Sequence, residues 1–148
     1  MHFAECERWW LAGSRRRKSP SGDSLDRRNR VRLERVTFAL DCGITVNPDL
    51  VRAQVEGGLI WALGAAAWGE VVLGDGGEII TQNFDRYPVM RMKSVPKIDV
   101  LLIQSGESPT GVGEVSVPTA APALTNAIAA ATGTRIRQLP IAKTMRVL

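Results

Sequence analysis

The hydrophobic pattern changes from loose alternation to a helical period between residues 31 and 68. Apolar residues alternate with polar ones over 31–40, VRLERVTFAL, which predicts a strand with one buried face. The next residues, DCGITVNPD, contain Gly43 and the pair Asn47-Pro48. These residues predict a turn and then a helix that begins at Pro48, with Asn47 as its N-cap.

The predicted helix continues through LVRAQVEGGLIWALGAAAW. Spacings of three and four residues place six residues on one side of it: Leu50, Ala53, Gly57, Ile60, Trp61 and Gly64. The pair Gly57-Gly58 weakens this helix by roughly 1 kcal/mol per glycine relative to alanine. Such a pair indicates that something packs close to the helix backbone, either a neighbouring helix or a cofactor.

The second half of the chain predicts a hairpin, a strand and a second helix. Two short apolar runs flank Gly74-Asp75-Gly76-Gly77, which is typical of a hairpin turn. A strand is expected at about 98–103 and a helix over Pro118–Thr132, closed by Gly133, and then a short terminal strand or an extended tail at RIRQLPI. The order predicts an α+β fold with two main helices and a small mixed or antiparallel sheet.

Composition limits the kinds of site the chain can carry. With 148 residues, 45% hydrophobic and 23% charged, the sequence fits one globular domain. No window approaches the roughly 18 consecutive apolar residues of a membrane span. The single histidine, His2, and two cysteines, Cys6 and Cys42, form no metal-binding motif, so we expect no metal ligated by protein side chains.

The positive charge is concentrated at the N-terminus. Ten of the 19 Lys and Arg lie in residues 1–35 against five acidic residues, so the remaining chain is close to neutral. The basic segment is either a solvated, disordered leader (1–30) or a nucleic-acid-binding module built on residues 8–35. We favour the leader, because no aromatic or helical framework organises the charges. No apolar stretch of an export signal follows the arginines, and a cytoplasmic or periplasmic location stays open.

Glu114 is the main candidate for chemistry. It ends PTGVGE, in which Gly111 and Gly113 flank Val112 and let the backbone turn sharply and approach a bound group. A carboxylate held there and partly desolvated can act as a general base. The alternative is an acidic residue that complements the dipole of the following helix.

Gln54 is the second candidate. Its amide can donate and accept hydrogen bonds from a glycine-lined helix face. The alternative is an ordinary glutamine on a helix surface.

Four segments, in order and at natural spacing, carry a family resemblance: DCGITVNPDLVRAQVEGGLIWALGAAAWGE, NFDRYPVMRMKSVPKIDV, PTGVGE and APALTNAIAAATGTRIRQLPI. From about Val31 to Ile141 the chain resembles the C-terminal part of the molybdenum-binding large subunit of the xanthine dehydrogenase and aldehyde oxidase family. Within the family, the likeness is greatest to isoquinoline 1-oxidoreductase beta subunits and related aldehyde dehydrogenases.

The resemblance implies a molybdenum–molybdopterin cofactor, often in its cytosine dinucleotide form, and oxidation of aldehydes or N-heterocycles with oxygen from water. It implies that Glu114 is the active-site base and that Gln54 lies beside the pterin. Because the two glycines bare the local amides, we also expect Gly111, Val112 and Gly113 to bind the cofactor. Electrons would leave through [2Fe–2S] clusters on a separate small subunit.

The resemblance also implies that residues 31–148 are a C-terminal fragment of a molybdopterin-binding domain, since a full subunit is several times longer. We therefore expect an incomplete domain that is inactive without the missing N-terminal part of the subunit. A non-functional truncated remnant is the remaining alternative.

Overall fold

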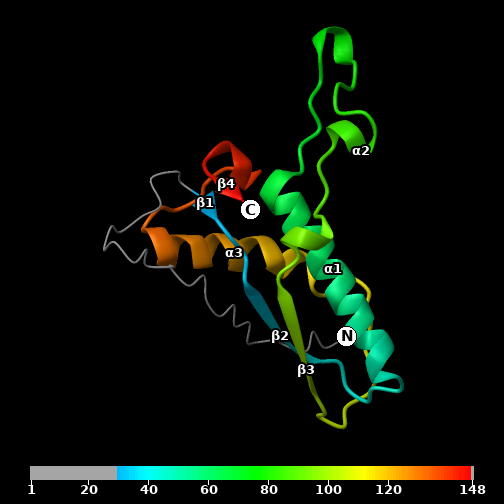
Figure 1. The fold of residues 1–148 in the computed structure, drawn as a ribbon. Helices are drawn as coiled ribbons and strands as arrows, with labels where there is room; N and C mark the ends of the chain where they lie inside the picture. Colours follow the sequence, from blue (N-terminus) through cyan, green and yellow to red (C-terminus); the bar gives the residue numbers. More distant parts are fainter. Residues whose placement is uncertain (1–29, 148) are drawn as a thin grey trace.

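The computed structural model describes residues 30–147 (Figure 1). The predicted leader, residues 1–30, lies outside the described residues apart from Arg30, and so does most of the 8–35 segment. The strands and α-helices are β1 (Arg30–Val31), β2 (Arg35–Asp41), α1 (Pro48–Trp68), α2 (Asn83–Arg86), β3 (Lys97–Ile103), α3 (Val117–Thr132) and β4 (Arg146–Val147). Short 3₁₀ helices lie at Asp75–Gly77, Met92–Ser94 and Ile141–Lys143.

The predicted α+β class with two main helices and a small sheet is confirmed, but its strands run differently from the expectation of a mixed or antiparallel sheet. β2 pairs with β3 in parallel, from Arg35 opposite Lys97 to Asp41 opposite Ile103. β1 and β4 form a second, two-residue parallel ladder. Antiparallel pairing among the described residues is confined to one bridge, Leu73 opposite Ile79. The chain between β2 and β3 passes through α1 and crosses back, and such a connection brings the second strand in parallel to the first.

The start of α1 and the end of α3 follow local chemistry. The Oδ1 atom of Asn47 accepts hydrogen bonds from the backbone N–H groups of Asp49 (3.1 Å) and Leu50 (3.2 Å), as predicted for the N-cap of α1. α3 ends at Gly133, which adopts φ +77° and donates its N–H to the carbonyl of Ala129. That left-handed conformation costs glycine little, which is why the predicted end of α3 is confirmed.

The core lies between the inner face of β2 and the two long helices. Alternate residues of β2 are buried, and so are residues at helical spacing on α1 and α3. The central side chains, each at most 2% exposed, are Val36, Phe38, Leu40, Val55, Leu59, Leu63, Leu124, Ile128 and Ile141.

The side of α1 that the spacing of Leu50, Gly57 and Trp61 picked out is not the side that enters this core. Leu50 is 65% exposed and Trp61 is 64% exposed, whereas Leu59 and Leu63 are buried. The second half of α1 is apolar on both sides, so periodicity alone could not choose between them.

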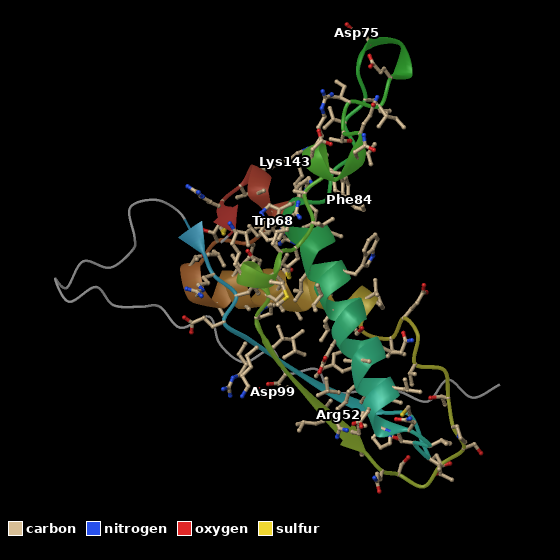
Figure 2. All side chains as sticks on the ribbon, turned by 45° about the vertical axis from the view of Figure 1, so that its right-hand side comes forward. Arg52, Trp68, Asp75, Phe84, Asp99 and Lys143 are labelled. Atoms are coloured by element: carbon tan, nitrogen blue, oxygen red, sulfur yellow. The ribbon has the colours of Figure 1, made fainter. Side chains whose placement is uncertain are left out.

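Residues 69–87 form an arm that extends away from the helices (Figure 1), with Asp75 at its tip (Figure 2). The predicted Gly74–Gly77 turn is present, and Gly74 donates its N–H to the carbonyl of Glu78 at 2.7 Å. The flanking runs pair only through the Leu73–Ile79 bridge and form no extended strands.

The C-terminal segment RIRQLPI is an extended tail rather than a strand. It runs into the 3₁₀ turn at Ile141–Lys143, and the terminal strand lies beyond it at Arg146–Val147.

Candidate active site

The segment that carries Glu114 connects β3 to α3 and is attached to the chain that leaves β2. The N–H of Ile44 donates to the carbonyl of Glu107 (2.9 Å), and the N–H of Thr110 donates to the carbonyl of Cys42 (3.0 Å). Gly43, at φ +72°, lets these two segments touch, because a β-carbon there would lie 2.3 Å from the Ser108 carbonyl oxygen. The carboxyl ends of the two parallel strands therefore position the loop that precedes α3.

A side-chain contact strengthens this attachment. Ser105 Oγ donates to Asp41 Oδ1 at 2.7 Å, and the backbone N–H of Gly43 donates to the same oxygen at 3.1 Å. These hydrogen bonds, the Ser105 one foremost, lower the pKa of Asp41 from its ordinary value. The ionised form of Asp41 is thus the one that joins the two loops.

The other end of the loop is fixed against α1. Ser116 is 1% exposed, and a β-carbon at Gly58 would lie 2.3 Å from its Oγ atom. Of the two explanations for the glycine pair, packing against a neighbouring helix terminus applies to Gly58. Nothing lies within 4 Å of the β-carbon position at Gly57, so packing does not account for that glycine.

Gln54 lies one helical turn before Gly58 on the same side of α1. Because Gly58 touches Ser116, this side of the helix faces the end of the loop that carries Glu114. Gln54 is exposed, and its side chain makes no hydrogen bond with another residue of the described part of the chain.

The Gly111–Gly113 segment is held at its centre and open on both sides. Val112 is partly buried and packs against the core. Gly111 and Gly113 are exposed, neither has a positive φ, and β-carbons at both positions would meet nothing within 4 Å. Within residues 30–147, the N–H groups of Gly111, Val112 and Gly113 donate no hydrogen bond. These donors are available to a bound acceptor.

Glu114 lies at the entry to α3, where its carbonyl accepts the N–H of Val117 at 3.0 Å. Its side chain is exposed, so the partial desolvation expected from the glycine turn is not present in this chain. The carboxylate stands two residues before the N-cap, Ser116, and this position is compatible with both the base and the helix-dipole interpretations.

The structure also has a cavity of about 250 Å³ that the predicted site residues do not line. It lies between one face of α1, from Gly57 to Ala65, and the segment Tyr87–Met90. Tyr87–Met90 lie in a segment that carries the family resemblance but were not predicted to line a site, although the run of apolar residues on α1 was a usable signal.

Among residues 30–147, no group of three or more His, Cys, Asp or Glu side chains is arranged to hold a metal ion. In the same part of the chain, no helix combines the length and apolar character needed to cross a membrane.

Comparisons with known proteins agree with the fold and the motifs. The model of a family described as the molybdopterin cofactor-binding domain matches residues 26–96. Isoquinoline 1-oxidoreductase subunit beta of Brevundimonas diminuta is 38% identical over 113 residues, which cover 76% of this chain and 14% of that subunit.

Two solved structures share the fold. The quinoline 2-oxidoreductase of Pseudomonas putida 86 superposes with a TM-score of 0.63 at 28% identity, over 72% of this chain and 15% of that one. The aldehyde oxidoreductase of Desulfovibrio gigas superposes with a TM-score of 0.65 at 26% identity, over 76% of this chain and 13% of that one.

The chain belongs to the molybdopterin-binding family of xanthine dehydrogenase-type molybdenum hydroxylases. It spans about a seventh of the length of the isoquinoline subunit that it matches.

Proposed function

We propose that this chain supplies the active-site base, Glu114, to a molybdenum hydroxylase that oxidises aldehydes or N-heterocycles with oxygen from water. One observation carries the proposal. The loop from Gly111 to Glu114 is flanked by Thr110, bonded to Cys42, and by Ser116, packed against Gly58, while the N–H groups of Gly111–Gly113 have no partner in the described chain. A loop that is rigidly placed but leaves its donors open suits a ligand rather than the chain's own core.

The open glycines fit a molybdopterin cofactor. Its phosphate and pterin groups offer hydrogen-bond acceptors, and the N–H groups of Gly111, Val112 and Gly113 donate to such acceptors. Gln54 contributes an amide from the α1 side of the same region. When bound, the molybdenum cofactor supplies the oxidation–reduction chemistry, and the protein orients it and shields it from water.

Glu114 accepts the proton that leaves the water-derived oxygen during attack on the substrate carbon. General bases work best where bulk water is excluded, yet Glu114 is exposed here. Its shielding then comes from the cofactor, the substrate and the rest of a large subunit. This chain matches only 13–14% of the length of two relatives, which is consistent with shielding of Glu114 by other parts of the enzyme.

The wider composition of the enzyme is part of the proposal. The names of the relatives, an isoquinoline 1-oxidoreductase subunit and an aldehyde oxidoreductase, support N-heterocycles or aldehydes as substrates. We further propose that the pterin is in its cytosine dinucleotide form, that a small [2Fe–2S] subunit receives the electrons, and that the chain is inactive without the remainder of the large subunit.

The test is reconstitution. The full chain is co-expressed with the B. diminuta isoquinoline 1-oxidoreductase complex. From the beta subunit of that complex, the segment that matches this chain over 113 residues is deleted. We expect molybdenum to be incorporated and dye-linked oxidation of isoquinoline or an aldehyde to be restored. Glu114→Gln should then lower kcat by about 10²–10⁴-fold, as expected for removal of a general base.

Glu107→Gln is the matched control, because Glu107 is an exposed glutamate of the same loop whose backbone carbonyl, not its carboxylate, accepts the N–H of Ile44. Full activity of Glu114→Gln in a reconstituted enzyme would contradict the assigned role. A chain that associates with the complex but restores no molybdenum or turnover would favour the non-functional remnant.

A further inference from the structure

The second half of α1 is more apolar than one buried face requires. From Gly57 to Trp68 the sequence is GGLIWALGAAAW, without a charged residue. The core uses one side of this stretch, where Leu59, Leu63 and Ala66 are at most 3% exposed. A helix that is hydrophobic all round is typical of full burial, so the opposite side also calls for a covering partner.

That opposite side forms a groove rather than a flat surface. Gly57, Ile60, Trp61 and Gly64 lie along one wall of the 250 Å³ cavity, and residues 87–90 form the other wall. We call this the α1 groove. Gly64 brings the two walls together, because a β-carbon there would lie 3.3 Å from the backbone nitrogen of Met90. Trp61 is 64% exposed at the rim.

We propose that the α1 groove docks an apolar segment from the remainder of the molybdopterin-binding large subunit. The inference deepens the proposed function, since it names the contact through which this chain joins its enzyme. In the two solved relatives, the matched fold is 13–15% of a longer chain, so most of each chain lies outside it and is available to cover it.

The chemistry of the groove favours apolar side chains as its occupants. No charged residue lines it, so it offers no ion pair to a phosphate or a carboxylate. A cavity of roughly 150 Å³ accepts a benzene-sized group, so this larger one has room for an aromatic or two aliphatic side chains. Buried anchors of this kind contribute most of the binding energy at protein interfaces.

The apolar surface continues from the groove onto the neighbouring arm. Phe84, in α2 just before the groove segment, is 71% exposed (Figure 2). Val71 (59%), Leu73 (63%) and Ile79 (50%) are exposed farther out. Large apolar side chains exposed in this way are typical of a protein-interaction surface.

In the experiment, the full chain carries an affinity tag and is co-expressed with a B. diminuta beta subunit from which the matched segment is deleted. The amount of beta subunit that co-purifies with the tagged chain is measured. Trp61→Glu places a charge in the groove and should reduce the co-purified subunit at least tenfold. Gly57→Leu fills the groove without a charge, into space that is open in this chain, and should cause a similar loss. Leu101→Glu is the control, because Leu101 is 57% exposed on β3, outside the groove.

Circular dichroism and the melting temperature of each isolated variant establish that the fold is retained. The proposal would be overturned if Trp61→Glu and Leu101→Glu co-purified equal amounts of the beta subunit. It would also be overturned if the unmodified chain did not associate with that subunit. A Trp61-dependent dimer of the chain alone in light scattering, or Trp61-dependent binding to phosphatidylcholine vesicles, would overturn it as well, since each assigns the groove to another occupant.

The outcome is separable from that for Glu114. Glu114→Gln should co-purify normally and fail only in turnover. Normal co-purification with full turnover would contradict the proposed function and leave the docking inference standing.

Discussion

Gly58 of α1 and Ser116 at the start of α3 meet without room for a single additional carbon atom. A β-carbon at residue 58 would lie 2.3 Å from Ser116 Oγ, well inside van der Waals contact. The adjacent glycine, Gly57, has open space at the same position. Packing therefore requires glycine at position 58, whereas position 57 has room for a larger side chain.

Substitution of the two glycines should have opposite effects on stability. Gly57→Ala should raise the free energy of unfolding by about 0.5–1 kcal/mol, because alanine favours the helix and meets no neighbour. Gly58→Ala gains the same helix preference but overpacks the junction, which typically costs about 1–3 kcal/mol. We expect a net loss of about 1 kcal/mol, measured by urea unfolding followed by circular dichroism.

A double substitution identifies the clash. Removing the hydroxyl with Ser116→Ala should restore most of the stability lost in Gly58→Ala, because the next atoms are 3.4 Å and 3.6 Å from the added carbon. Equal stability of Gly57→Ala and Gly58→Ala would contradict the close approach.

The N-cap of α1 gives a second stability prediction. Asn47→Ala removes the acceptor for two backbone N–H groups, those of Asp49 and Leu50, and should cost about 1 kcal/mol. Asn47→Asp keeps an oxygen at the same place and should stay within a few tenths of the parent protein. Thermal or urea unfolding measures both, and an alanine variant as stable as the aspartate variant would count against the cap.

Local sequence signals predicted where the helices begin and end better than which side of a helix is buried or how the strands pair. The start of α1 and the end of α3 depend on Asn47, Pro48 and Gly133, whose effects act within one turn. The buried side of α1 was not predictable, because Trp61 and Leu63 are equally hydrophobic candidates for the core. Strand direction depended on how β3 returns beside β2, a contact between distant residues that no local pattern encodes.

For the candidate site, too, the sequence indicated individual residues but not how they are covered. Glu114 and Gln54 were selected partly by resemblance, and the structure gives the loop and helix that hold them. The exposure of Glu114 could not be inferred from its neighbours, because burial depends on whatever covers the loop from outside. The α1 groove was missed because its second wall, Tyr87–Met90, comes from a segment without a regular period.

The contact between Asp41 and Ser105 predicts a pH dependence. Hydrogen bonds in the folded state lower the pKa of Asp41, so the folded protein favours the ionised form. The resulting stabilisation is fully present above the ordinary aspartate pKa of about 3.9 and is lost as the pH falls through the lower folded value.

Ser105→Ala removes the largest cause of this shift and should move the pKa of Asp41 back toward its ordinary value. An NMR titration of the Asp41 carboxyl carbon measures the change directly. The parent protein and the variant should differ less in stability as the pH falls below about 3.9. A pKa of Asp41 that is unchanged in Ser105→Ala would show that the Gly43 amide alone is responsible.

Replacement of Gly111 and Gly113 should separate cofactor binding from folding. In this chain a β-carbon at either position meets nothing within 4 Å, and neither residue has a positive φ, so Gly111→Ala and Gly113→Ala should change stability by less than about 0.5 kcal/mol. If the loop backbone binds the cofactor as proposed, the same methyl groups weaken that contact in the reconstituted enzyme. We therefore expect the molybdenum and pterin content to fall while the melting temperature of the isolated chain stays the same.

Ala123→Ser, on α3 away from the loop, is a control of similar size. Full cofactor content in both alanine variants would show that the bare backbone of this loop is not a cofactor contact.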